Sequence, residues 1–155
     1  MQTFTGRQFF PMGPRANEVD ILDIAHALSM QCRYNGYVQK FMSVAEHCVL
    51  VSRLVPDEHA LWGLLHDATE AYVGDMVRPR KQHMPAFCAA EDRVMLAIAQ
   101  RFNIAPEIPA AVHEADSRIL LDERSALLGE PSADWEVPGE PFGIEIGAWD
   151  PAPAA

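Results

Sequence analysis

Apolar residues recur at helical spacing in five segments of this chain, and that periodicity is the strongest constraint on its fold. In the first segment Ile21, Ile24 and Leu28 fall three or four residues apart, which places them on one face of a helix. The pair Asn35-Gly36 then supplies a stop signal. The pattern therefore predicts a helix that starts near residue 19.

Residues that commonly begin helices mark two of the later segments. Ser43 reads as an N-cap, and Glu46 three residues later completes the pattern of a capping box. Pro85 stands in the first turn of another predicted helix, where proline is favoured because its missing N–H has no partner there. The predicted helices cover residues 19–33, 44–55, 57–72, 85–102 and 109–128.

These helices predict an all-α fold, a single bundle of five or more helices formed by residues 1–155, a chain with the length of one domain. The helical body covers about 19–129. A short irregular segment precedes it, in which Phe4 and Phe9 flank a turn and predict a hairpin or an apolar flap. A second irregular segment, 130–155, follows, and its aromatic and aliphatic residues predict that part of it packs on the body.

The charge distribution excludes some classes of partner. The net charge is −10, and residues 130–155 hold six acids without a Lys or Arg, which leaves 16 acids against 12 bases in residues 1–129. Polymeric nucleic acid needs clustered cations, so it is not an expected partner. The sequence contains no run of eighteen apolar residues, so a membrane span is not expected. Its first residues do not show the pattern of a signal peptide, so none is expected. Three cysteines without a CxxC pair favour reduced thiols and a cytoplasmic protein.

The stretch LLHDATEAYVGD, residues 64–75, sets polar residues along an apolar helix. His66, Asp67 and Glu70 are spaced so that the three side chains can point to one side. Imidazole and carboxylate are ligands of divalent metal ions. The alternative is a solvated polar face, which is the more common reason for a lone His-Asp pair.

Two further residues favour the metal interpretation. His47 lies among apolar residues of the second predicted helix, where a histidine is often a satisfied core residue. Asp116 lies on a partly apolar face of the fifth predicted helix, and a buried carboxylate needs a partner. With His66 and Asp67 they supply two His and two Asp from three helices, a plausible ligand set with room for water.

The ordered pattern of His47, His66-Asp67 and Asp116 resembles the H…HD…D signature of the HD-domain metal-dependent phosphohydrolases. HDATEAYVGD, with Glu70 three residues after the Asp, resembles the branch of bacterial 5′-deoxynucleotidases and small phage dATP triphosphohydrolases. The resemblance covers about residues 20–128. The interval between the two histidines is shorter than in that family, and the C-terminal segment offers no motif.

The resemblance implies roles for particular residues. One divalent ion (Co, Mn, Zn, Fe or Mg) would be held by four ligands, with Glu70 assisting proton transfer beside Asp67. The implied metal ligands are His47, His66, Asp67 and Asp116, and the implied substrate contacts are Arg33, Asp75 and Lys81. Relatives in that family form dimers and larger rings, so the resemblance also implies a homo-oligomer.

The expected function is hydrolysis of 2′-deoxynucleotides at the α-phosphorus. The basic run that ends in Lys81 is compatible with a dATP-type triphosphohydrolase that releases deoxynucleoside and triphosphate. A 5′-deoxynucleotidase that releases phosphate from dNMPs is the alternative within the same chemistry. Two alternatives lie outside it: a non-catalytic nucleotide-binding module of the HD type, and a metal-free helical interaction protein.

Overall fold

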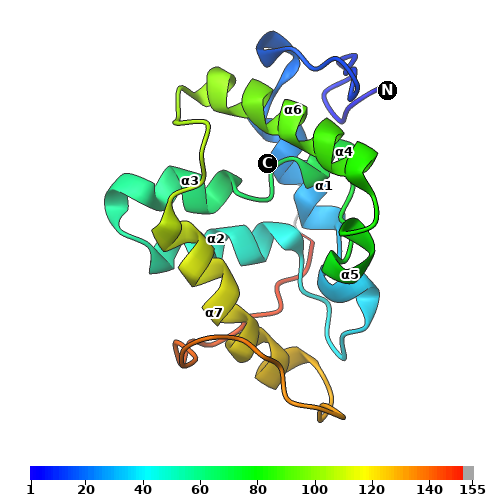
Figure 1. Cartoon of the computed structure of the whole chain (residues 1–155). Helices are drawn as coiled ribbons and strands as arrows, with labels where there is room; N and C mark the ends of the chain where they lie inside the picture. Colours follow the sequence, from blue (N-terminus) through cyan, green and yellow to red (C-terminus); the bar gives the residue numbers. More distant parts are fainter. Residues whose placement is uncertain (152–155) are drawn as a thin grey trace.

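Helices carry nearly all the regular structure of the computed structural model, which describes residues 1–151 (Figure 1). The described chain contains isolated β-bridges, Gln2–Gln8 and Cys32–Ser43, but no strand. The predicted all-α class is confirmed. The α-helices are α1 Ile21–Met30, α2 Val44–Leu54, α3 Ala60–Leu65, α4 Glu70–Val73, α5 Arg78–Lys81, α6 Pro85–Phe102 and α7 Ala110–Leu127, and the 3₁₀ helices are Ala16–Glu18, Arg33–Gly36 and Asp57–His59.

The first predicted helix, 19–33, was too long at its C-terminal end. α1 ends at Met30, and a short 3₁₀ turn with left-handed residues follows, with φ of 55° at Tyr34 and 53° at Asn35. The helix ends at Met30 because Gln31 and Cys32 are extended, with ψ of 125° and 133°. The chain therefore leaves α1 before the Asn-Gly signal, and Arg33 and Tyr34 both donate hydrogen bonds to the buried Glu123.

The predicted helix over 57–72 was wrong as one continuous element. It consists of a 3₁₀ turn, α3, a tight turn at residues 66–69 and α4. Within the turn, the backbone N–H of Ala68 donates to the carbonyl of Leu65, and that of Glu70 donates to the carbonyl of Asp67, both three residues back. This winding is tighter than an α-helix. It lies at the His66-Asp67 pair, which therefore stands between α3 and α4 and not inside one long helix.

The N-cap predicted at Ser43 is confirmed, because its Oγ accepts a hydrogen bond from the Glu46 N–H at 3.0 Å. The second half of the predicted capping box, in which the Glu46 carboxylate would accept from the backbone N–H of Ser43, is wrong. The Glu46 carboxylate does not return to the start of α2 but accepts hydrogen bonds from the backbone N–H groups of Ala148 and Trp149. The helix α5 was missed by the sequence analysis, since four residues are too few to show a periodicity.

α2 is the central element, and it packs against α1, α3 and α7 (Figure 1). Two apolar clusters fill the core. The first joins α1, α2, α6 and the N-terminal segment, where Phe9 is fully buried and stacks on Tyr72. The second lies between α2, α3 and α7, and the C-terminal segment packs on it through Phe142, Ile144 and Ile146. The prediction that this segment packs on the body is confirmed for the residues described.

The N-terminal segment forms the predicted hairpin, since Gln2 pairs with Gln8. The last four residues of the predicted segment 130–155 lie outside the described residues. None of the helices in residues 1–151 is long and apolar enough to cross a membrane.

Gly63 permits the close approach of α3 to α2. A Cβ at this position would lie 2.7 Å from the backbone Cα of Ser52. We expect Gly63→Ala to lower the free energy of unfolding by about 1–3 kcal/mol, because backbone cannot yield as a side chain can. Urea denaturation measures the effect. Gly13→Ala, where a Cβ meets nothing within 4 Å, is the control, and equal stability of the two variants would contradict this account.

Candidate metal centre

Four side chains from separate parts of the sequence converge beside α2. His47 comes from α2, His66 and Asp67 from the turn after α3, and Asp116 from α7. The two Nε2 atoms lie 3.1 Å apart. Oδ1 of Asp116 lies 3.2 Å from Nε2 of His47, and Oδ2 of Asp67 lies 3.3 Å from Nε2 of His66. Neighbouring ligand atoms on one ion, bound at 2.0–2.2 Å, are separated by about 3.0–3.5 Å, so His47, His66 and Asp67 can hold a metal ion, with Asp116 beside them.

The hydrogen bonds of the two imidazoles show which nitrogen atom of each ring carries the proton. Nδ1 of His66 lies 2.7 Å from the carbonyl oxygen of Gly63, which can only accept, so this nitrogen carries the proton. Nδ1 of His47 donates in the same way to the Glu123 carboxylate at 2.6 Å. When both rings are neutral, their Nε2 atoms face each other with lone pairs at 3.1 Å, and a proton or a metal cation between them relieves this repulsion. This arrangement fits a bound cation.

The close contact between imidazoles and carboxylates also shifts the pKa values of these groups. Burial alone would lower the pKa of both imidazoles, but the surrounding carboxylates, Glu123 for His47 and Asp67 for His66, outweigh burial and raise it. Burial would conversely raise the pKa of Asp67 and Asp116, yet the two imidazoles hold both carboxyl groups well below their usual range. The centre is therefore built to surround positive charge.

Glu123 is a site residue that the sequence analysis missed. Its side chain is fully buried, and its carboxylate accepts from Tyr34 Oη at 2.6 Å and Arg33 Nη2 at 3.0 Å as well as from His47. Burial would raise the pKa of Glu123, but the attraction of a protonated His47 and of the Arg33 guanidinium lowers it to about 2. Its spacing of seven residues from Asp116 was the available signal, since that interval returns to the same helix face.

The structure brings two of the three predicted substrate contacts close to the cluster. Arg33 Nη1 lies 3.8 Å from Asp67 Oδ2. Lys81 pairs with Glu91 and shares a cavity with the metal-ligand cluster. Asp75 is exposed and does not line that cavity. Neighbouring side chains nevertheless shield its carboxyl group partly from water, which raises the pKa of Asp75 against the lowering effect of Arg33.

Glu70, the predicted proton-transfer residue, starts α4 one turn beyond Asp67. Its Oε2 is buried and has no hydrogen-bond partner among the described residues. Burial, followed by the negative charges of Asp67 and Asp75, raises the pKa of Glu70 from 4.5 to about 9. A carboxyl group in this state holds a proton at neutral pH.

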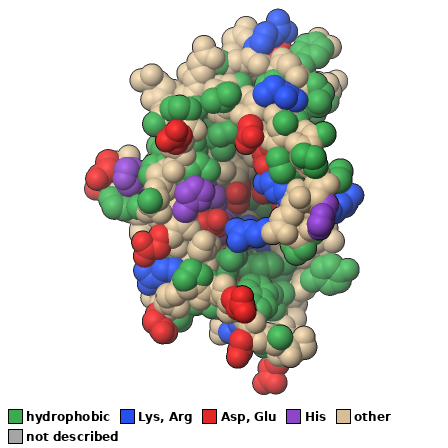
Figure 2. Space-filling model, viewed as in Figure 1, with side chains coloured by type: hydrophobic (Ala, Val, Ile, Leu, Met, Phe, Trp, Pro, Cys, Tyr) green, Lys and Arg blue, Asp and Glu red, His purple; other side chains and the backbone are tan. Residues whose placement is uncertain are grey.

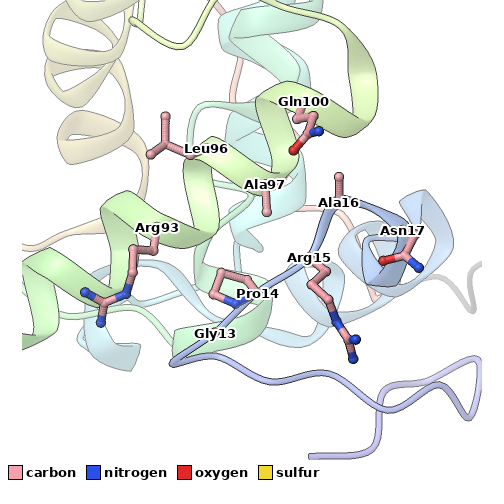
Figure 3. A pocket seen from close by; sticks show the side chains of 9 residues that line it. All are labelled: Gly13, Pro14, Arg15, Ala16, Asn17, Arg93, Leu96, Ala97 and Gln100. Atoms are coloured by element: carbon pink, nitrogen blue, oxygen red, sulfur yellow. The ribbon is translucent and has the colours of Figure 1, made fainter.

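A cavity of about 260 Å³ opens beside the cluster, and Figure 2 shows histidine, acidic and basic side chains around a hollow on this face. His66, Asp67 and Asp116 line one part of it, and Arg78 and Lys81 line another. A larger hollow of about 660 Å³ lies between residues 13–17 and α6 (Figure 3). There Arg15 and Arg93 point in different directions, and Arg15 pairs with Glu18. The smaller cavity is therefore the better candidate for a reaction site.

An all-α protein with a His-Asp cluster able to hold a metal ion is the class that fold and site define. The chain is 36% identical over 137 residues to the uncharacterized protein YfdR of Escherichia coli, an alignment that covers 88% of this chain and 77% of YfdR. The chain belongs to the family of YfdR. It is also 34% identical over 146 residues to an uncharacterized protein of Rhodobacter capsulatus, with 84% of this chain and 74% of the relative covered. No protein-family model matches the chain.

The hydrogen bond between Glu123 and His47 predicts that removing Glu123 weakens metal binding. We expect Glu123→Ala to weaken the binding of Co²⁺ or Zn²⁺ by roughly 10–100-fold, because His47 loses the partner that fixes its ring and tautomer. Titration calorimetry on folded protein measures the change. Glu114→Ala removes an exposed acid of the same helix and is the matched control. Unchanged metal affinity in Glu123→Ala would show that His47 needs no such support.

The raised pKa of Glu70 predicts a pH-dependent stability in metal-free protein. The folded state holds this proton up to about pH 9, whereas the ordinary value is 4.5, so its contribution to stability is complete below pH 4.5 and is lost as pH rises toward 9. Glu70→Gln, which stays neutral, should match the wild type near pH 4.5 and exceed it by at least about 1 kcal/mol at pH 8.5. Urea unfolding in a chelator measures this difference, and a pH-independent difference would contradict it.

Proposed function

We propose that this protein is a metal-dependent phosphohydrolase of the HD type that acts on 2′-deoxynucleotides at the α-phosphorus. The observation that carries the proposal is the pair of imidazole Nε2 atoms, flanked by two carboxylates, at the edge of a cavity that basic side chains also line. The choice of deoxynucleotides rests on the resemblance of HDATEAYVGD to that branch of the HD phosphohydrolases.

His47, His66, Asp67 and Asp116 would hold the ion. A bound divalent ion supplies a water of lowered pKa and neutralises charge on the phosphate. Glu70 carries a buried carboxyl oxygen that has no hydrogen-bond partner among the described residues, so it can protonate a leaving oxygen or, when ionised, take a proton from water. Glu123 keeps His47 in the tautomer that presents Nε2.

The cations around the cavity bear on the substrate. Arg78 and Lys81 line the cavity and can contact phosphate oxygens there, and Arg33 Nη1 lies 3.8 Å from Asp67 Oδ2. More than one cation favours a triphosphate, as in a dATP triphosphohydrolase. The 5′-deoxynucleotidase alternative is favoured by a different observation: Lys81 is already paired with Glu91, and the cavity of about 260 Å³ suits a small phosphate group.

A hydrolysis panel tests the proposal. Purified protein is incubated with Co²⁺, Mn²⁺ or Mg²⁺ and with dAMP, dATP, dGTP, ATP or cyclic nucleotides, and the released phosphate or triphosphate is identified. We expect turnover of a deoxynucleotide that Asp67→Ala abolishes. Glu70→Gln should retain the metal but lower kcat by roughly 100- to 10,000-fold, since it removes a general acid or base.

Glu58→Gln, a change of the same type at an exposed position, is the matched control and should behave as the wild type. Absence of turnover on every nucleotide with every metal would contradict the enzyme proposal. Nucleotide binding without turnover would instead favour the non-catalytic module.

A further inference from the structure

The segment 142–149, which has no regular secondary structure, is fixed to α7 at one end through a buried carboxylate. Asp122 accepts hydrogen bonds from the backbone N–H groups of Phe142 at 2.8 Å and Ile144 at 2.9 Å. The Arg118 guanidinium, one turn earlier on α7, lies 4.0 Å from the centroid of the Phe142 ring. This end of the segment is therefore bound to the surface of α7.

The other end is fixed to α2 by the same device. Glu46 is almost fully buried and accepts from the backbone N–H groups of Ala148 at 2.8 Å and Trp149 at 2.7 Å. Arg53, two turns along α2, lies under the Trp149 ring. Charge-assisted hydrogen bonds of this kind are about twice as strong as neutral ones.

Both carboxylates are direct sequence neighbours of residues in the metal centre. Glu46 precedes His47, and Asp122 precedes Glu123. Successive side chains of a helix diverge by about 100°. Glu46 and Asp122 therefore point to the segment, whereas their neighbours His47 and Glu123 point to the cluster. Two polar contacts of His47 cross from α2 to α7: Nδ1 lies 2.6 Å from Glu123 Oε1, and Nε2 lies 3.2 Å from Asp116 Oδ1.

We propose that segment 142–149 is a strap that ties α2 to α7, and that Glu46 and Asp122 are positioning residues of the metal centre. The apolar contacts between the two helices are not directional, whereas hydrogen bonds are. The four hydrogen bonds of the strap fix their relative position, and with it the contacts of His47 to Glu123 and Asp116. This inference rests on the metal binding in the proposed function.

Single carboxylate variants leave the strap attached through its apolar side chains, since Phe142, Ile144 and Ile146 pack on the second core cluster. We expect full-length Glu46→Ala to fold, to bind Co²⁺ roughly tenfold more weakly, and to show altered visible absorption bands of the bound Co²⁺. Glu46→Gln keeps one carbonyl acceptor and should recover part of the affinity. Glu145→Ala, an exposed acid within the strap, should match the wild type.

Co²⁺ affinity and the absorption spectrum are measured below the thermal midpoint of every variant. A folded Glu46→Ala protein with the affinity and spectrum of the wild type would overturn the strap proposal and leave the metal centre intact. Failure of the wild type to bind Co²⁺ would overturn the metal centre itself. If Glu46→Ala does not fold, Asp122→Asn decides: weakened Co²⁺ binding supports the strap, and wild-type binding overturns it.

Discussion

The account depends on two imidazole rings whose Nε2 atoms face each other at 3.1 Å. Neither ring can turn away, because the Gly63 carbonyl fixes His66 and the Glu123 carboxylate fixes His47. Two neutral rings in this position repel each other, so the protein must supply a proton or accept a cation between them. The nearby carboxylates of Asp67 and Asp116 make positive charge favourable there.

The helical body was largely predictable from sequence because amphipathic periodicity extends over most of it. α6 occupies the predicted range 85–102, and α7 differs from its prediction by a single residue at each end. The break between α3 and α4 was not predictable, since its i to i−3 hydrogen bonds leave the apolar pattern of residues 57–72 unchanged. That break lies at His66 and Asp67, so this detail of the site was hidden from periodicity.

The candidate site likewise contains residues that the sequence predicted and one that it did not. The grouping of His47, His66, Asp67 and Asp116 was expected from their pattern, and the structure brings them together. Glu123 was missed because its partner His47 lies 76 residues away, and helix propensities do not encode such a pairing. Tertiary packing decides whether an acid on an amphipathic helix is a solvated residue or a buried acceptor.

Buried acids change the meaning of the charge distribution. Glu46, Asp122 and Glu123 would all pass for surface acids in the sequence, yet each is nearly or fully buried and accepts several hydrogen bonds. Glu46 and Asp122 accept backbone N–H groups of the C-terminal segment, and Glu123 accepts a hydrogen bond from His47 of the metal centre. Part of the negative charge therefore organises the interior and does not repel anionic substrates at the surface.

X-ray absorption of the Co²⁺-loaded protein tests the central claim most directly, because it reports the atoms around the ion. The account predicts about one ion per chain with nitrogen and oxygen ligands near 2.0–2.2 Å and the multiple-scattering pattern of two imidazoles. A sulfur ligand, or a shell of oxygen atoms without imidazole, would place the ion elsewhere and contradict the account.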